Sequence, residues 1–311
     1  MELRQFRYFV AVARERSFSK AAEALHIAQP PLSRQIQQLE DELGVLLLDR
    51  SERPLKLTDA GRFFYDQALQ MLGRIDQIRE GTRRIGRAER SLFVIGCVAS
   101  TLYGGIPDLV RRMRLRWPDL DIELREMMST QQVVALKEGR IDLGFGRVRF
   151  NDPVVDRQVL REERLVFAMP SSHPQASGTA PLPMSIISQE TLILYPSEPR
   201  PSFADEVLSL LADRGLHPKR IQEVRELQTA MGLVAAAVGI SLVPASAQRL
   251  RSYDVIYRQI ADEHVVSPVI MSYRQNDRSG RIEVIKELIH EMYADHPDWL
   301  QLSENKLLPP Q

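Results

Sequence analysis

Cysteine is almost absent from this chain of 311 residues, because Cys97 is the only one. One cysteine cannot form an intrachain disulfide or a cysteine-based zinc site, so nothing in the sequence requires an oxidising compartment. Cys97 lies in an apolar run, and we expect it to be a small buried hydrophobe. The six histidines are scattered, with no pair at the spacing of a metal site. We therefore expect no metal and no cofactor.

The chain also lacks net charge, because 41 Lys and Arg residues balance 41 Asp and Glu residues. This balance excludes a general electrostatic attraction to nucleic acid or to an anionic membrane, so any such binding must come from local charge. Hydrophobic residues make up 44 % of the chain and charged residues 26 %. That composition is typical of a soluble globular protein, and the length suggests two or three domains.

Long apolar runs are missing as well. The longest, residues 231–245, contains Gly, Ser and Pro and falls short of the roughly 20 residues that a membrane helix needs. Glu2, Arg4 and Arg7 stand where a signal peptide would have its apolar segment. P-loop, G-x-S-x-G, H-E-x-x-H and G-x-G-x-x-G motifs are also absent. These absences predict a cytoplasmic protein that is neither a membrane protein nor an enzyme.

Residues 1–57 have the pattern of short helices followed by a β-hairpin. One buried helical stripe is formed by Leu32, Ile36, Leu39 and Leu43. Pro30 and Pro31 suit the first turn of this helix, and Gly44 suits its C-terminal end. Apolar segments on both sides of a polar turn at 51–53 predict two short strands. The pattern indicates a winged helix-turn-helix.

The second helix of such a motif lies in the major groove, with its outward side chains against base edges. If the apolar stripe faces inward, Gln29, Ser33 and Arg34 face outward, and their amide, hydroxyl and guanidinium groups are those that read bases. On the wing, Arg50 and Arg53 could reach the phosphate backbone. A helical bundle with a solvated polar face is the alternative on pattern alone.

The charge of this region is weak for a DNA-binding domain. Residues 1–60 hold nine basic and nine acidic residues, and residues 61–90 hold seven Arg and four acidic residues. The basic side chains must therefore gather on one face, while Glu40, Asp41 and Glu42 point away from it. We expect dimers or larger oligomers that contact two half-sites.

Residues 58–88 predict one long helix, with Thr58 and Asp59 as N-cap candidates. Apolar residues recur in alternating steps of four and three from Phe64 to Ile85, with Thr82 as a polar exception, which is typical of a heptad seam. A helix with one narrow apolar stripe has little else to pack on, so the expected partner is a second copy of the chain. Packing on the neighbouring domain is the alternative.

From residue 91 onward, apolar segments rich in β-formers alternate with helical patterns. We expect strands at 92–98, 120–124, 141–145, 164–169, 191–195, 240–243 and 268–273, and helices at 104–115, 130–138, 203–214, 228–238 and 281–293. This alternation predicts an α/β domain of mostly parallel sheets covered by helices. Joints near 147–156 and 262–267 suggest two lobes, one of residues 91–161 and 268–311, the other of residues 162–267.

A two-lobe α/β domain binds its ligand in the cleft, where strand ends and helix N-termini meet. Hydroxyls follow three expected strands, at Ser100, Ser129 and Ser202, and each precedes or begins a helix whose free N–H groups favour an anion. Each serine can also be a plain N-cap. Arg147 would lie near the crossing between the lobes and either pair with a ligand carboxylate or brace the hinge. Phe203 would close over an unsaturated ligand or belong to the core.

Residues 21–61, AAEALHIAQPPLSRQIQQLEDELGVLLLDRSERPLKLTDAG, closely resemble the N-terminal signature of LysR-type transcriptional regulators. The likeness covers the whole chain and implies a DNA-binding domain at 1–57, a dimerisation helix at 58–88 and a two-lobe effector domain at 89–311, similar to periplasmic binding proteins. It also implies a homotetramer that bends operator DNA, with RNA polymerase as a candidate further partner. The residues that the resemblance places on DNA are Gln29, Pro30, Ser33, Arg34 and Arg53.

Parts of the effector domain resemble the family branch that controls catechol and benzoate degradation and responds to cis,cis-muconate, a flat diene with a carboxylate at each end. The stretches that carry this likeness are residues 135–147, 193–207 and 232–246. The resemblance implies that Ser100 and Ser129 hold one carboxylate, and that Pro201, Ser202 and Phe203 hold the other. Threonine is frequent in the family at the position of Ser129, and the hydroxyl is kept.

Arg161, Glu226 and Tyr293 suggest a second, more apolar pocket for an aromatic acid, or else an ordinary internal ion pair capped by tyrosine. The function that these observations favour is a ligand-responsive transcriptional activator of aromatic catabolism. The alternative from another class is a soluble dicarboxylate-binding protein, which would need no DNA-binding domain and would carry an export signal.

Overall fold

A computed structural model describes residues 1–51, 54–86, 91–250, 253–275, 277–297 and 299–300. The chain divides into two compact units, one of residues 1–89 with 137–140 and the other of residues 90–136 with 141–311. No helix among the described residues is both long and apolar enough to cross a membrane.

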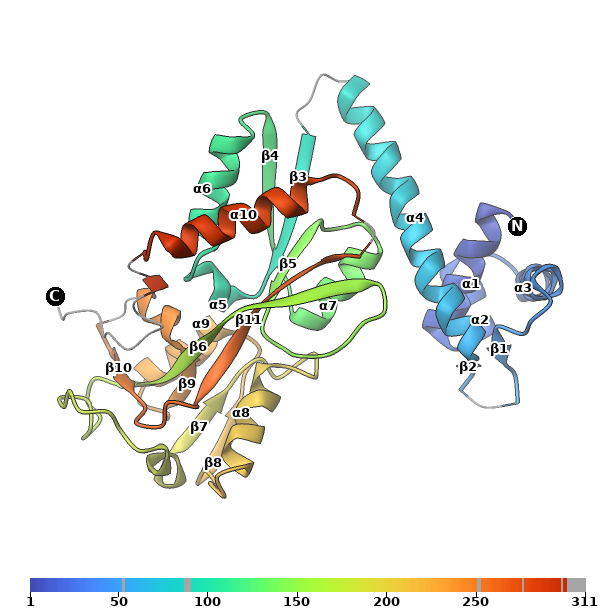
Figure 1. Cartoon of the computed structure of the whole chain (residues 1–311). Coiled ribbons are helices and arrows are strands. Elements are labelled where there is room, and N and C mark those ends of the chain that lie inside the picture. The colour runs from blue at the N-terminus through green and yellow to red at the C-terminus, as the bar shows by residue number, and fades with distance from the viewer. Residues whose placement is uncertain (52–53, 87–90, 251–252, 276, 298, 301–311) are drawn as a thin grey trace. The chain divides into compact units, whose positions relative to one another are not determined.

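The first unit consists of short helices, a β-hairpin and one long helix (Figure 1). Its elements are α1 (Leu3–Glu15), α2 (Phe18–Ala24), α3 (Gln29–Leu43), β1 (Leu48–Asp49), β2 (Lys56–Leu57) and α4 (Asp59–Gly86). In α3 the stripe of Leu32, Ile36 and Leu39 is fully buried, whereas Leu43 is half-buried. Gly44 ends the helix in the left-handed conformation, with φ of 69°. The structure thus confirms the predicted helix-turn-helix and hairpin.

The predicted seam of α4 divides into two parts. Phe64 and Ala68 pack in the core of their own unit, where the Phe64 ring lies 5.2 Å from that of Phe6 in α1. Further along, Met71 and Ile78 are 50 % and 56 % exposed. The expectation of one continuous unpartnered seam is therefore wrong for its first two members, because α1 covers them. The side chain of Ile85, the last member, lies outside the described residues.

The first turn of α4 approaches the hairpin very closely. The Thr58 hydroxyl accepts a hydrogen bond from the Gly61 N–H at 2.9 Å and donates to the Leu46 carbonyl at 2.7 Å, so Thr58 is the N-cap as predicted. A Cβ atom at Gly61 would lie 1.9 Å from the carbonyl oxygen of Leu47. Only glycine fits this approach without movement of the backbone.

The second unit contains a seven-stranded sheet, a separate two-stranded sheet and flanking helices (Figure 1). Its strands are β3 (Ser91–Cys97), β4 (Leu120–Glu126), β5 (Leu143–Gly146), β6 (Val155–Pro170), β7 (Thr191–Leu194), β8 (Arg220–Glu223), β9 (Ser241–Pro244), β10 (Val255–Gln259) and β11 (Val266–Arg274). Its helices are α5 (Ala99–Leu102), α6 (Ile106–Arg116), α7 (Ser129–Lys137), α8 (Phe203–Ala212), α9 (Leu227–Ala235) and α10 (Arg281–Ala294), with 3₁₀ turns η1 (Met184–Gln189) and η2 (Ala245–Arg249).

Two long strands, β6 and β11, connect the two lobes of this unit. They run antiparallel to each other, because the chain passes from one lobe to the other and back. β6 also pairs antiparallel with β9 and β10, while β3 pairs parallel with β4 and β5, and β7 with β8. The expectation of mostly parallel sheets is thus wrong at the crossing. β8 and β10 were not predicted, and β6 begins well before residue 164.

Each lobe has its own core. In the first lobe, α6 and α10 cover one face of the sheet formed by β3, β4 and β5, and α7 covers the other. In the second lobe, α8 and α9 enclose β7, β9 and the end of β6. Cys97 is buried in the first core, as predicted, and burial raises the pKa of its thiol to about 12. The two cores leave their strand ends and helix N-termini facing each other.

Candidate functional site

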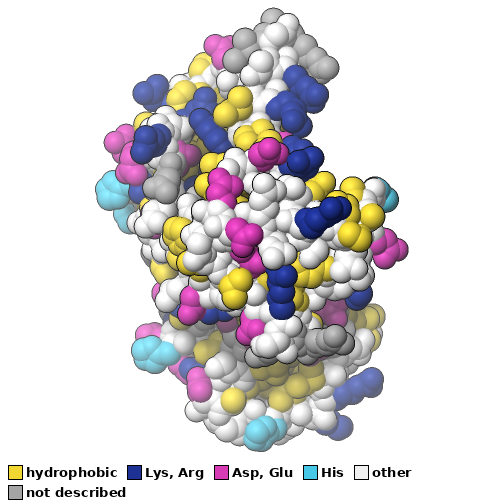
Figure 2. Space-filling view, turned by 90° about the vertical axis from the view of Figure 1, so that its right-hand side faces the viewer, with side chains coloured by type: hydrophobic (Ala, Val, Ile, Leu, Met, Phe, Trp, Pro, Cys, Tyr) yellow, Lys and Arg dark blue, Asp and Glu magenta, His cyan; other side chains and the backbone are white. Residues whose placement is uncertain are grey.

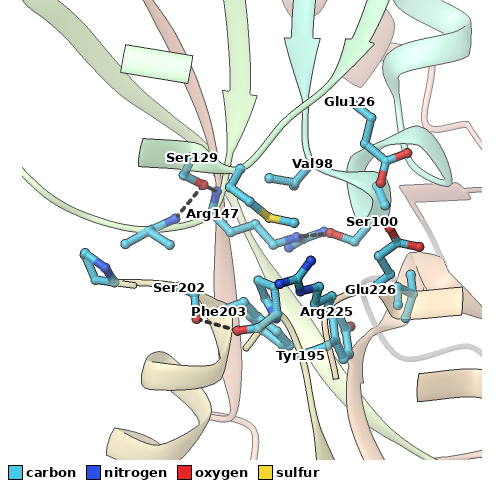
Figure 3. A pocket seen from close by; sticks show the side chains of 16 residues that line it. Val98, Ser100, Glu126, Ser129, Arg147, Tyr195, Ser202, Phe203, Arg225 and Glu226 are labelled. Atoms are coloured by element: carbon cyan, nitrogen blue, oxygen red, sulfur yellow. Dashed lines mark hydrogen bonds between the residues drawn. The ribbon is translucent and has the colours of Figure 1, made fainter. Parts of the chain in front are cut away.

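A cavity between the two lobes is lined by all six residues predicted for effector binding (Figure 3). They are Ser100, Ser129 and Arg147 from the first lobe, and Pro201, Ser202 and Phe203 from the second. The space that protein atoms leave free is about 520 Å³, part of it open to solvent. This size lies in the range of small-molecule sites.

Arg147 organises the first-lobe side of the cavity. Its side chain is 2 % exposed, and its Nε donates to the Ser100 hydroxyl oxygen at 2.7 Å. Its backbone N–H donates to the Ser129 hydroxyl oxygen at 3.1 Å. Its Nη2 pairs with Oε2 of Glu163 on β6 at 2.7 Å. Arg147 therefore braces the crossing between the lobes through an internal carboxylate.

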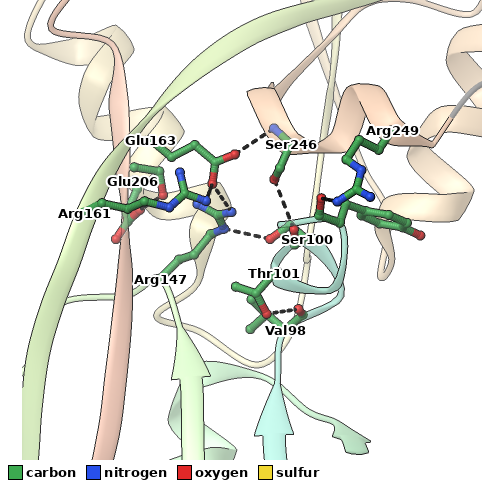
Figure 4. A network of polar contacts seen from close by, with 11 residues as sticks. Val98, Ser100, Thr101, Arg147, Arg161, Glu163, Glu206, Ser246 and Arg249 are labelled. Carbon is green, nitrogen blue, oxygen red and sulfur yellow. Dashed lines mark hydrogen bonds and ion pairs between the residues drawn. The ribbon is translucent and has the colours of Figure 1, made fainter. Parts of the chain in front are cut away.

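Glu163 is the centre of a buried polar network (Figure 4). It is fully buried, and it also accepts from Arg161 Nη2 at 3.2 Å and from the Ser246 backbone N–H at 2.7 Å. Burial alone would raise the pKa of Glu163, but Arg147, Arg161 and the Ser246 hydrogen bond outweigh it and lower the pKa to about 2. Glu163 thus remains ionised at neutral pH and holds two arginines at the crossing.

This network leaves hydroxyl donors free for an anion. A serine hydroxyl has one donor and accepts through its oxygen. Because the oxygens of Ser100 and Ser129 accept from Arg147, their hydrogens can donate into the cavity. Ser100 and Ser129 are themselves buried. The first-lobe side therefore suits a carboxylate.

The second-lobe side is built differently. The Ser202 hydroxyl donates to the Pro196 carbonyl at 3.0 Å, and the Ser202 N–H donates to Asp205 Oδ2 at 2.6 Å. Ser202 is thus the N-cap of α8, and its hydroxyl hydrogen is already used. The first N–H groups of α8 and the guanidinium of Arg225 remain to meet an anion here.

An aromatic wall completes this side of the cavity. The Phe203 ring lies 5.4 Å from that of Tyr195, and both are buried. Tyr195 and Arg225 were not among the predicted residues. Tyr195 ends a predicted strand and looked like core, while Arg225 follows β8, a short strand without a strong apolar pattern.

The predicted second pocket needs a correction. A smaller cavity is lined by Arg161 and Tyr293, together with apolar side chains such as Leu160 and Met292. Glu226 lies instead on the first cavity, so the three residues do not share one pocket. The carboxylate that pairs with Arg161 is Glu163, which lies two residues along the same strand.

Most of the α3 residues that are predicted to read DNA are exposed. Gln29, Pro30 and Arg34 are exposed, and Ser33 is half-buried at the edge of the apolar stripe. Figure 2 shows one face of the molecule, on which Lys and Arg side chains lie interspersed with Asp and Glu.

Arg50, which is predicted to reach the phosphate backbone, forms an ion pair within its own unit. Its Nη2 pairs with Glu40 Oε2 at 2.7 Å, and Glu40 also accepts from the backbone N–H groups of Leu47 and Leu48. Glu40 points away from the outer face of α3, as expected, but it points into the protein and is buried. The ion pair between Arg50 and Glu40 therefore connects the wing to α3. Arg53 lies outside the described residues.

Replacing Arg34 by Ala is expected to weaken DNA binding by roughly 1–3 kcal/mol, because the exposed guanidinium at the start of the predicted recognition helix would contact bases or phosphates. A gel shift with the full chain measures the change. Arg111→Ala, which removes an exposed arginine on α6, is the control and should bind normally. Equal affinity of Arg34→Ala and the control would remove Arg34 from the DNA contacts.

Two family models match the chain. Residues 3–62 match "Bacterial regulatory helix-turn-helix protein, lysR family", and residues 86–294 match "LysR substrate binding domain". The chain is 56 % identical to the probable cat1 operon transcriptional activator of Acinetobacter lwoffii, over 96 % of this chain and 99 % of that protein.

Solved structures agree with these matches. Full-length BenM, a regulator of Acinetobacter baylyi, superposes with a TM-score of 0.62 at 45 % identity, covering 95 % of this chain and 98 % of that one. The BenM effector-binding domain with its effector benzoate has a TM-score of 0.62 at 40 % identity, over 67 % of this chain and 94 % of that one.

Proposed function

Because this chain belongs to the LysR family of bacterial helix-turn-helix regulators, we propose that it activates aromatic-degradation genes when an unsaturated dicarboxylate such as cis,cis-muconate binds between its lobes. The observation that carries this proposal is the cluster of Ser100, Ser129 and Arg147 facing the N-terminus of α8 across one cavity. The likeness to a cat1 operon activator and to a benzoate-binding effector domain supports the ligand class.

Each end of the diacid would meet a different kind of partner. One carboxylate accepts from the Ser100 and Ser129 hydroxyls, whose oxygens are bound by Arg147. The other faces the N-terminus of α8 and Arg225, where free N–H groups and positive charge favour an anion. The flat diene between them packs on the ring of Phe203. A saturated or singly charged acid would lose one of these contacts.

The response follows from contact with both lobes at once. A ligand shifts a conformational equilibrium only by its difference in affinity for the two states, and a coupling of about 1–3 kcal/mol is typical. An effector that bridges the lobes favours one lobe arrangement. In a homotetramer on operator DNA in the cytoplasm, this changes the spacing of the DNA-binding pairs, the bend between them and the access of RNA polymerase.

The alternative of a dicarboxylate transport receptor is not retained. Such a receptor needs no DNA-binding unit, whereas residues 3–62 match the family's helix-turn-helix model. The buried stripe and exposed outer face of α3 are also what a recognition helix requires.

Replacing Ser129 by Ala tests the proposed effector site. We expect cis,cis-muconate to bind roughly 10- to 100-fold more weakly, because a hydrogen bond to a charged group contributes roughly 1.5–3 kcal/mol. Isothermal titration calorimetry on the full chain measures the change, with operator binding checked separately. Thr130→Val is the matched control, because its buried hydroxyl, one residue further along α7, has no hydrogen-bond partner.

The outcomes separate the parts of the proposal. Unchanged muconate affinity of Ser129→Ala would move the site away from this cavity. Binding of benzoate but not of muconate by the wild-type chain would replace the diacid by an aromatic acid. Loss of operator binding in Ser129→Ala would mean that the variant is damaged beyond the cavity.

A further inference from the structure

A carboxylate outside the cavity, Glu206, joins α8 to the crossing between the lobes. The Ser267 hydroxyl donates to Glu206 Oε2 at 3.2 Å, and the backbone N–H of Arg149 donates to the same carboxylate. Ser267 is buried on β11. Glu206 lies in the first turns of α8, the helix that begins at Phe203. One side chain thus links the cavity-facing end of this helix to both the crossing strand and the segment after β5.

The position of Ser267 brings Glu206 close to the buried network. Ser267 stands directly opposite Glu163 in the antiparallel register of β11 and β6. Side chains of directly opposed residues lie on the same face of a sheet. Figure 4 draws Glu206 beside Glu163, Arg147 and Arg161. The hydrogen bond between Glu206 and Ser267 therefore joins α8 to β11 directly opposite Glu163, which pairs with Arg147 and Arg161.

We propose that Glu206 is a positioning residue for the effector, and that its protonation couples effector affinity to pH. It holds the first turn of α8, with Ser202 and Phe203, against the crossing strands. When it gains a proton, the charge beside the cavity changes without loss of the acceptor oxygen that binds Ser267. The inference rests on the proposed function, because it requires an anionic effector in the cavity.

The groups around Glu206 come from four segments. Arg147 and Arg149 follow β5, Glu162 and Glu163 lie on β6, Ser267 lies on β11, and Asp205 on α8 pairs with Arg200. Burial raises the pKa of Glu206 to about 7, and the Ser267 hydroxyl and the two arginines keep it from rising further. The pKa of Glu163 is lowered to about 2. Near neutral pH, Glu206 therefore changes charge while Glu163 does not.

The sign of the coupling follows from charge. Arg147 favours the ionised form of Glu206. A dianionic effector held by the Arg147 cluster offsets this positive charge and adds negative charge of its own, so it raises the pKa of Glu206 further. The complex then takes up a proton, and linkage requires effector affinity to fall as the pH rises from the pKa of the free protein to that of the complex. A shift of one pKa unit corresponds to about a tenfold change in affinity.

Calorimetry on the full chain with cis,cis-muconate tests the inference. At about pH 6, pH 7 and pH 8.5, in buffers of different ionisation enthalpy, the wild-type chain is expected to lose up to about tenfold in affinity towards high pH and to take up a proton on binding. Glu206→Gln keeps an acceptor for Ser267 and Arg149 but cannot titrate. Its pH dependence and proton uptake should disappear, whereas Glu206→Ala, which loses the acceptor for Ser267 and Arg149, should bind muconate more weakly than Glu206→Gln at every pH.

The control is Glu283→Gln, which removes a carboxylate paired with Lys286 on the surface of α10 and should keep the wild-type profile. Wild-type proton uptake in Glu206→Gln, or no pH dependence in the wild type, would overturn the inference while muconate binding stands. No muconate binding at any pH by a folded chain that still binds operator DNA would instead overturn the proposed function, and this inference with it.

Discussion

Replacing Glu163 by Gln is expected to lower the free energy of unfolding of the effector domain by about 3–5 kcal/mol, because removal of one partner leaves buried charge uncompensated. Arg147 is almost fully buried, and Arg161 shares the same carboxylate oxygen. The amide of Gln can still accept from the Ser246 N–H, so the loss reports the charge and not the shape. Urea unfolding at neutral pH, followed by circular dichroism, measures it.

The pH dependence of the free energy of unfolding tests the role of Glu163 in a second way. The pKa of Glu163 lies at about 2 in the folded protein and at 4.5 when unperturbed. A lowered pKa contributes stability that is fully present above the unfolded value and is lost as the pH falls towards the folded value. The wild type should therefore lose this contribution between about pH 4.5 and pH 2, and Glu163→Gln should not.

Glu283→Gln is the matched control, because it makes the same substitution in an exposed pair with Lys286. Surface pairs of this kind contribute about 0–1 kcal/mol. If Glu163→Gln lowered the free energy of unfolding as little as this control does, Arg147 and Arg161 would be compensated by other groups. The network around Glu163 would then not stabilise the crossing.

Replacing Gly61 by Ala is expected to destabilise the DNA-binding unit by roughly 3 kcal/mol and to abolish specific operator binding. The added methyl group would meet the Leu47 carbonyl oxygen, which is backbone and cannot rotate away. Either α4 or the hairpin must shift. The Arg50–Glu40 pair and the wing would move with the hairpin. Thermal unfolding and a gel shift with the full chain measure both effects.

Gly81→Ala is the control for that substitution, on the same helix but with no described atom beyond its chain neighbours and the adjacent helix backbone within 4 Å of the added Cβ. Alanine is favoured over glycine within helices, so this variant should be more stable by about 0.5–1 kcal/mol. Opposite signs for one substitution at two positions of α4 would separate the close contact from helix propensity. Equal effects would contradict the close approach at Gly61.

The order of elements could be predicted from the sequence because it depends on local patterns. The stripe on α3, the prolines at its start and Gly44 at its end are signals within one segment, and the structure agrees with each. The strands missed by the sequence analysis are β8 and β10, short segments with mixed polarity. Such strands are stabilised by pairing with β7 and β6, which local patterns do not contain.

The polar core could not be predicted for the same reason. In residues 155–164 charged side chains are so frequent that the segment resembles an exposed joint. In the structure it forms part of a crossing strand, because the charge of Glu163 is neutralised by Arg147, which follows β5, and by Arg161. The burial of Glu40 could not be predicted either, since its partners Leu47, Leu48 and Arg50 come later in the chain. Partners distant in sequence decide whether a charge is buried.

The two lobes offer different hydrogen-bond donors to the cavity, and this difference determines which cavity residues can change among related proteins. In the proposed site, the carboxylate on the α8 side meets main-chain N–H groups and Arg225, whereas the hydroxyl of Ser202 caps the helix and donates to the Pro196 carbonyl. Threonine can cap a helix and can also donate to the Pro196 carbonyl, so position 202 can vary between serine and threonine without loss of the proposed effector contacts. Selectivity between effectors would then depend on Ser100 and Ser129 in the first lobe and on the rings of Tyr195 and Phe203. The positions of these side chains would limit the length and the thickness of the acid that fits.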